Sequence, residues 1–162
     1  MITTARLRLR PLTLADTDWW VELHSDPEVN RFVGAYTREQ ATARLTAIEE
    51  QWQTRGHGLC AVELAATGEQ IGRSGLNHWA QFDEVEAGWT FARAHWGQGY
   101  AAEAARAVVD WGFTTLALPR ITAMIHHGNT ASTAVAARLG FTVLREDTLA
   151  GRPITVHALD RD

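Results

Sequence analysis

The sequence predicts a single domain of mixed α and β structure, in the α+β class, over residues 1–162. Three strand-like runs follow one another between residues 59 and 92 with only short turns between them, as in an antiparallel meander. Helical patterns with their own capping residues stand before and after these runs. No internal repeat, low-complexity tract or linker divides the chain, and its 162 residues suffice for one sizeable core. The predicted order of elements is β-α-α-β-β-β-α-β-α-β-β.

The N-terminal third is predicted to form a strand and two helices. In ARLRLRPL, leucines alternate with arginines, which predicts a half-buried strand. TLAD, from Thr13, matches a capping box, and Pro27 disfavours helix before it, so the first helix should end near Ser25. A second capping pattern at Thr37 opens an amphipathic helix that ends near Gly56. The segment DPEVNRFVGAYT is expected to be the loop between the helices.

The rest of the chain is predicted to alternate between strands and helices. The expected strands of the meander are LCAVELA, QIGRSGLNHW and EVEAGWTFA. A helix follows, with a buried stripe of Ala101, Ala104, Ala105, Val108, Trp111 and Gly112. RITAMIH is the next strand, and a short helix runs from Asn129 to about Leu139 before Gly140. FTVLRE and PITVHAL form a closing pair of strands.

Composition excludes several classes of protein. Of the residues, 46% are apolar and 21% are charged, as in ordinary globular proteins. A net charge of -4 disfavours general affinity for nucleic acid or an anionic membrane. The single cysteine, Cys60, lies in an apolar run and is expected to be a buried small hydrophobe. Because the sequence shows neither a signal core nor a membrane span, a cytoplasmic protein is expected.

Two glycines stand directly before a helical pattern in HWGQGYAAEAARAVVDWGF, residues 95–113. The first turn of a helix offers free N–H donors and the positive end of its dipole, so the turn is expected to bind an anion. It matches the loose dinucleotide pattern G-x-G-x-x-A, but antiparallel strands precede it and the next strand ends in no acidic residue. No Gly-Lys-Ser/Thr follows, which excludes a P-loop. A connector without a ligand is the remaining alternative.

Several segments in order resemble the GNAT acetyltransferase superfamily, and within it the RimJ/RimL-like ribosomal-protein N-terminal acetyltransferases. They are WGQGYAAEAARAVVDWGF, LPRITAMIHHGNTAS, AARLGF and the opening ARLRLRPLTLADTDWWVELHSDPEV, which together span most of the chain. The resemblance implies a mostly antiparallel central sheet with a splayed parallel pair and about four flanking helices. It also implies acetyl-CoA as the acetyl donor, an amine on a peptide N-terminus or small molecule as acceptor, and a homodimer. A non-catalytic CoA-binding sensor or scaffold is the alternative.

The resemblance also assigns the cofactor contacts. The pyrophosphate is expected on the loop after Trp96, at Gly97, Gln98, Gly99, Tyr100, Ala101 and Ala102. The pantetheine arm is expected between the strands 84–92 and 120–126, near the backbone of Phe91 and Ala92. Asn129 and Ser132 match the N-x-x-S pair beside that arm. A plain helix N-cap is the alternative for Asn129.

Direct attack of an amine on a thioester requires a base, because an ammonium cannot attack. Alternation places Glu86 on one face of its strand together with Gly88 and Thr90. Glu86 matches the glutamate of the subgroup's E-I-G-Y segment, here EAGW, and is the candidate base. A salt-bridged or solvated carboxylate is the alternative, and His78 is the rival base.

The same family pattern bears on the general acid. Ala136 stands where many members of the superfamily carry a tyrosine that protonates the thiolate, so Ser132 is the candidate acid.

The acceptor is expected at the first two helices and the loop between them. Trp19, Trp20, Phe32 and Tyr36 could line a pocket there with His78, while Asp26 and Glu28 could attract a cationic amine. No metal is expected, because His126 and His127 are adjacent on a strand and point to opposite faces. HExxH and CxxC patterns are also absent from the sequence.

Overall fold

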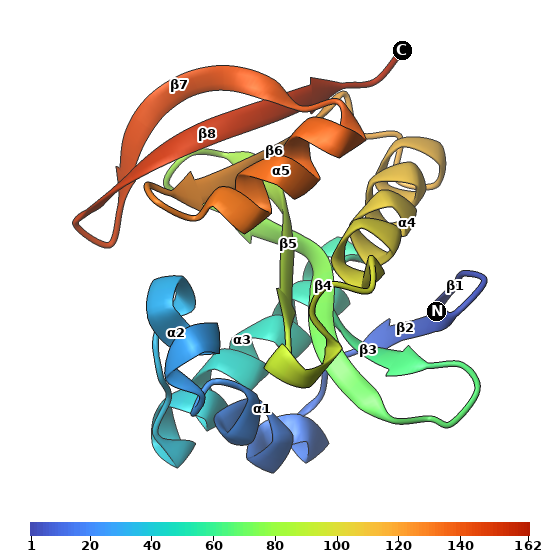
Figure 1. The fold of residues 1–162 in the computed structure, drawn as a ribbon. Coiled ribbons are helices and arrows are strands. Elements are labelled where there is room, and N and C mark those ends of the chain that lie inside the picture. Colours follow the sequence, from blue (N-terminus) through green and yellow to red (C-terminus); the bar gives the residue numbers. More distant parts are fainter.

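The computed structural model describes all 162 residues as one eight-stranded sheet with helices on both faces (Figure 1). The sheet order is β1-β2-β3-β4-β5-β6-β8-β7. The strands are β1 Ile2–Thr3, β2 Leu7–Pro11, β3 Leu59–Leu64, β4 Gln70–Trp79, β5 Glu84–Phe91, β6 Arg120–His126, β7 Thr142–Leu149 and β8 Arg152–Asp160. The helices are α1 Thr17–Leu23, α2 Pro27–Val33, α3 Arg38–Arg55, α4 Tyr100–Thr114 and α5 Thr130–Leu139. The predicted α+β class and the antiparallel meander of β3, β4 and β5 are confirmed.

The sheet parts between β5 and β6, which are its one parallel pair. Glu86 and Thr122 are the only residues that pair across this junction, whereas β4 and β5 pair along their whole length from Gly72–Phe91 to Trp79–Glu84. Beyond this pair, the alternate peptide groups of β5 that do not bond to β4 therefore face a gap instead of a neighbouring strand. The expected splayed parallel pair is confirmed, and it lies near the centre of the sheet.

Each face of the meander carries its own core, because alternate residues of a strand point to opposite faces. On one face, α4 packs its predicted stripe against β4 and β5, with Leu76 and Ala87 fully or almost fully buried. On the other face, α1 and α3 enclose Trp20, Leu45 and Leu59. Figure 1 shows α4 and the α1–α3 group on different sides of β4 and β5. Cys60 is also buried, and burial raises the pKa of its thiol to about 12, as suits an inert core residue.

The predicted helix caps are present in the structure. The Thr13 and Thr37 hydroxyls each accept a backbone hydrogen bond, and both sites form complete capping boxes. The first helix is interrupted, because residues 14–16 form a 3-10 turn before α1 begins at Thr17. None of the helices is long and apolar enough to cross a lipid bilayer.

The segment expected to be a loop, residues 26–37, contains a helix instead. Asp26 accepts a hydrogen bond from the Glu28 N–H over 3.0 Å, and Pro27 occupies the first helical position. Proline suits that position because its missing N–H would be unpaired there anyway. The protein therefore has five α-helices, where about four were expected, and the additional helix α2 lies beside the gap in the sheet.

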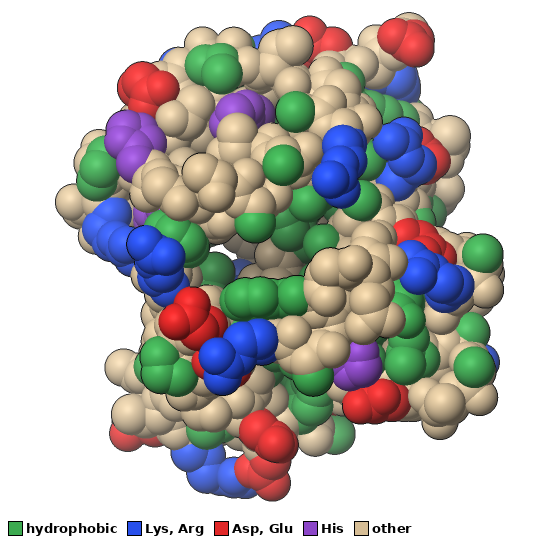
Figure 2. Space-filling view, in the orientation of Figure 1, with side chains coloured by type: hydrophobic (Ala, Val, Ile, Leu, Met, Phe, Trp, Pro, Cys, Tyr) green, Lys and Arg blue, Asp and Glu red, His purple; other side chains and the backbone are tan.

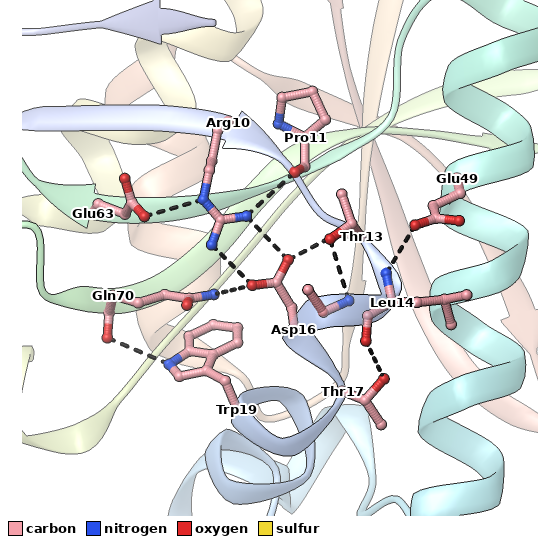
Figure 3. A network of polar contacts seen from close by, with 11 residues as sticks. Arg10, Pro11, Thr13, Leu14, Asp16, Thr17, Trp19, Glu49, Glu63 and Gln70 are labelled. Atoms are coloured by element: carbon pink, nitrogen blue, oxygen red, sulfur yellow. Dashed lines mark hydrogen bonds and ion pairs between the residues drawn. The ribbon is translucent and has the colours of Figure 1, made fainter.

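Buried polar contacts fix the first helices to the sheet (Figure 3). Arg10 of β2 donates to both oxygens of Asp16, over 3.0 and 2.8 Å, and to Glu63 of β3 over 3.0 Å. Asp16 also accepts the Thr13 N–H over 2.9 Å and an amide hydrogen of Gln70 over 3.4 Å. Burial alone would raise the pKa of Asp16, yet these hydrogen bonds hold it below its usual value.

Candidate functional site

Two cavities meet at the gap between β5 and β6. One, here called the loop cavity, has a volume of about 560 Å³ and is lined by the glycine turn before α4. The other, here called the glutamate cavity, has a volume of about 540 Å³ and is lined by Glu86. Figure 2 shows the molecule hollowed between the half that holds α5 and β6–β8 and the half that holds α1–α3. The residues that line both cavities are Phe32, Val33, Trp89, Thr90, Asn129 and Ser132.

The glycine turn presents unpaired backbone donors to the loop cavity. Gly97 and Gly99 have φ values of +77° and +82°, which favour glycine. A Cβ atom at Gly97 would meet no protein atom within 4 Å, so the space before it is open. The backbone N–H groups of residues 97–102 donate no hydrogen bond within the protein. These donors fit the oxygens of a phosphate or pyrophosphate.

Arg6 holds the glycine turn in place, which the sequence reasoning missed. Its guanidinium donates to the Gln98 carbonyl over 3.0 Å, forms an ion pair with Glu103 at 2.6 Å, and lies 4.3 Å from the Tyr100 ring centroid. Tyr100, Ala101 and Ala102 line the cavity as expected. Gln98 does not line it, and its carbonyl is occupied by Arg6.

The backbone of β5 offers polar groups to the gap, although not at Ala92. The Ala92 N–H donates to the Ile71 carbonyl over 2.9 Å, and Ala92 lines neither cavity. Because peptide groups alternate along an antiparallel ladder, those of Trp89 and Phe91 face the gap. The Phe91 carbonyl accepts the Trp96 indole N–H over 2.8 Å. The groups left free for an added chain are therefore the Phe91 N–H and the peptide groups of Trp89.

Asn129 and Ser132 lie where the two cavities join. The Asn129 side chain accepts the Ser132 N–H over 3.2 Å, so Asn129 caps α5 and still lines both cavities. The Ser132 hydroxyl has no hydrogen-bond partner within the protein and is free to contact a bound molecule. Ala136, at the position of the common tyrosine, is fully buried in the core.

Glu86 is fixed across the gap by donors from two strands. The Trp79 indole N–H donates to Oε1 over 2.8 Å, and the Met124 backbone N–H donates to Oε2 over 3.1 Å. Burial raises the pKa of Glu86, against these hydrogen bonds and the charges of Arg73 and Arg44. A carboxylate with a raised pKa that faces a cavity is suited to accept a proton near neutral pH.

Two arginines lie on the same face as Glu86, and sequence reasoning missed both. Arg73 of β4 is 9% exposed, and Arg44 of α3 donates to Asn77 over 3.1 Å. Asn77 pairs directly with Glu86, and Arg73 pairs with Thr90 in the same register. That register could have been found from the sequence, because alternation in the paired strands places these side chains together.

Three of the five expected acceptor residues line the glutamate cavity, and Trp19 and His78 do not. The three that do are Trp20, Phe32 and Tyr36, and the ring centroids of Trp20 and Tyr36 are 5.4 Å apart. His78 does not line it, because its β4 position points to the opposite face, where its ring contacts Asp83 over 3.3 Å.

The two expected acidic residues have other roles. Asp26 caps α2 and pairs with Arg93 over 3.0 Å, and Glu28 lines the loop cavity. The glutamate cavity thus contains no carboxylate except Glu86.

Comparison with known proteins agrees with this geometry. Residues 6–142 match the family model of the acetyltransferase (GNAT) domain. The N-acetyltransferase p20 of Bacillus licheniformis is 34% identical over 142 residues, which cover 85% of this chain and 80% of that protein. An acetyltransferase structure from Agrobacterium tumefaciens strain C58 is 35% identical, with a TM-score of 0.88, and the alignment covers 99% and 94% of the two chains.

A more distant structure shares the fold alone. It is the acetyltransferase from Salmonella typhimurium that modifies the N-terminal serine of ribosomal protein L7/L12. It is 16% identical, with a TM-score of 0.82 and coverage of 98% and 97% of the two chains.

Proposed function

This chain belongs to the GNAT acetyltransferase family and is an acetyl-transferring enzyme, and from that premise we propose that it transfers the acetyl group of acetyl-CoA to a primary amine. The observation that carries the proposal is the meeting of two cavities at one gap in the sheet. One cavity has free backbone donors for a pyrophosphate, and the other has a partly buried carboxylate with a raised pKa. A donor and an acceptor can thus enter separately and meet at the junction.

The loop cavity has the chemistry that acetyl-CoA requires. The open N–H groups of residues 97–102 would hold the pyrophosphate, and Arg31 and Arg138, which also line the cavity, add positive charge. The free peptide groups of Trp89 and Phe91 would hold the pantetheine arm as an added strand would be held. When bound, acetyl-CoA supplies a thioester carbonyl, which is the electrophile of the reaction.

We assign the proton transfers to Glu86 and Ser132. Glu86 takes a proton from the ammonium form of the acceptor, directly or through a water, so that the nitrogen lone pair can attack. As the new C–N bond forms and the C–S bond breaks, the nitrogen gives its second proton to the Ser132 hydroxyl, which passes its own proton to the departing sulfur, so that an amide and a free thiol are released. A thiol has a pKa near 8.5, so the leaving group needs no stronger acid than this.

The acceptor amine belongs to a peptide N-terminus or to a small molecule. The opening segment resembles that of the RimJ/RimL-like subgroup and supports a protein N-terminal amine, whereas the glycine turn does not distinguish the two classes. The glutamate cavity has walls formed in part by Trp20, Phe32 and Tyr36 and is large enough for either class.

The proposal is tested by measuring thiol release from acetyl-CoA with a panel of amines and peptides, together with the mass of the acetylated product. We expect release that depends on a free primary amine and is absent with the same peptide carrying a blocked N-terminus. If acetyl-CoA binds but no amine in the panel gives product, the proposed transfer to a primary amine is refuted.

A further inference from the structure

We propose that the acceptor carries an anionic group, a carboxylate or a phosphate monoester, besides its amine, and that Arg73 and Arg44 bind this group in the glutamate cavity. The inference rests on the proposed function in that it assigns the class of the second substrate. The cavity, its charges and its unpaired donors are features of the protein itself.

The charge of the glutamate cavity is unbalanced. Its lining contains three arginines, Arg44, Arg73 and Arg152, and one carboxylate, Glu86. None of the three arginines forms an ion pair with a carboxylate. Elsewhere, six arginines each lie within 4 Å of an acidic side chain: Arg6, Arg10, Arg38, Arg93, Arg120 and Arg145. The other unpaired arginines, outside the cavity, are all exposed, whereas Arg73 is buried and Arg44 is half-buried, so this cavity has excess positive charge that is partly shielded from solvent.

Arg73 is the arginine for which the lack of an anionic partner costs most, because a buried guanidinium without an anion is unfavourable. Its Nε and Nη2 atoms donate to the His24 Nε2 over 3.3 and 3.2 Å. The His24 Nδ1 lies 2.7 Å from the Trp20 carbonyl and must carry the ring proton, since a carbonyl can only accept. Burial lowers the pKa of His24 to about 3, so this partner is neutral.

Burial lowers the pKa of Arg73 to about 10, which leaves it charged at neutral pH. Its Nη1 donors have no partner within the protein.

Other donors near Arg73 also lack acceptors. The guanidinium lies 4.7 Å from the Trp20 ring centroid, and the Trp20 Nε1 is buried without a hydrogen-bond partner. Arg44 donates only to the neutral Asn77 amide. An anion held here would lie on the same face of the sheet as Glu86, because the pairing of β4 with β5 places the side chains of Arg73, Asn77 and Glu86 on one face. The amine and the anionic group of one molecule can therefore occupy a single cavity.

The first experiment measures anion binding without turnover. Glutarate, which has no amine, is titrated into protein saturated with acetyl-CoA, with the neutral diamide glutaramide as the matched probe. We expect saturable binding of glutarate and none of glutaramide. Arg44→Gln should weaken glutarate binding by about tenfold or more, because a charge-assisted hydrogen bond is lost. Arg44 is preferred to the buried Arg73 because it is half-buried and its loss should leave the fold intact.

The control is Arg55→Gln, the same substitution on an exposed position of α3 outside the cavity. It should bind glutarate as the wild type does. Absence of glutarate binding, equal binding of glutaramide, or full binding by Arg44→Gln would overturn the inference.

The second experiment compares amines of similar length. In the wild type, 4-aminobutyrate and 2-aminoethyl phosphate should have higher kcat/KM values than 4-aminobutanamide, and Arg44→Gln should remove the preference mainly through KM. The better of the two anionic amines distinguishes a carboxylate from a phosphate. Preference for the amide contradicts the inference. Glutarate binding that depends on Arg44, without acetylation of any amine, leaves the anion site standing and refutes the proposed function alone.

Discussion

Trp79 donates its indole hydrogen to Glu86 over 2.8 Å, and this bond joins β4 to the carboxylate that spans the gap between β5 and β6. The other oxygen of Glu86 accepts the Met124 N–H, which otherwise would face the space left by the parting strands. Glu86 therefore restores a lost backbone hydrogen bond and is held rigidly at the cavity wall. The position of Glu86 therefore depends on the same parting of β5 and β6 that leaves room for the acetyl donor.

Replacing Trp79 should move the pH dependence of acetyl transfer. The indole hydrogen bond favours ionised Glu86, so Trp79→Phe should raise the pKa of this carboxyl further above its usual value. The acidic limb of kcat/KM, where Glu86 loses its proton, should then shift to higher pH. Trp19→Phe is the matched control, since its indole contacts the Gln70 carbonyl outside the cavity. An unshifted limb in Trp79→Phe would mean that another group titrates there.

Gly97→Val should abolish acetyl-CoA binding while the protein stays folded. The side chain would enter open space where a phosphate must approach the backbone. In the wild type, acetyl-CoA at 100 times its dissociation constant should stabilise the fold by about 2.7 kcal/mol, and NADH should not. The variant should lose this shift in a thermal melt.

Gly68→Val is the control for that variant. Gly68 has a φ of +78° against +77° at Gly97, and a Cβ there also meets nothing within 4 Å. Both variants should carry a similar backbone strain, of order 1–3 kcal/mol. Gly68→Val should keep the acetyl-CoA shift, because Gly68 lies outside the loop cavity. Equal binding by both variants would refute the pyrophosphate assignment.

The stability of the fold should depend on Asp16 in a defined pH range. Asp16→Asn leaves Arg10 with one carboxylate partner instead of two and should cost about 2 kcal/mol at pH 7. The folded state holds the pKa of Asp16 below its usual value, so its contribution is complete above the unfolded pKa, about 3.9. The difference between the two proteins should shrink as pH falls below that value.

Urea unfolding at pH 7 and pH 3 measures this difference. Asp18→Asn is the control, because the Asp18 side chain is 82% exposed and its pair with Arg38 lies in solvent. Its free energy of unfolding should equal that of the wild type at both pH values. If Asp16→Asn lowers the free energy of unfolding by the same amount at pH 3 as at pH 7, the substitution removes packing interactions and not a charge interaction.

Local patterns in the sequence were enough to predict most of the fold. Capping residues such as Thr37, and alternation such as Leu7 and Leu9, act within a few residues, so they predict elements without knowledge of the whole. Helix α2 was missed because Asp26–Pro27 both ends one helix and begins another, and the two outcomes share one sequence signal.

The site was predicted less completely, because its charges depend on contacts between distant elements. Gly97 and Gly99 stand in a recognisable local turn, and their placement at the loop cavity agrees with that prediction. Arg73 and its neutral partner His24 are separated by 49 positions, so no local pattern relates them. His78 was predicted as a rival base because it lies on the strand next to that of Glu86. The pairing of β4 with β5 places its side chain on the opposite face of the sheet from Glu86, outside the glutamate cavity.

The most direct test of the account is the pH–rate profile of Glu86→Gln. The amide keeps the shape of the side chain but cannot take a proton, so kcat should fall by about 100- to 10,000-fold near neutral pH, or about 3–5 kcal/mol. The loss should shrink as pH approaches the pKa of the acceptor amine, because the free amine needs no base. Acetyl-CoA affinity should be nearly unchanged. A loss that is the same at every pH would make Glu86 a positioning residue, and no loss at any pH would contradict its role in acetyl transfer.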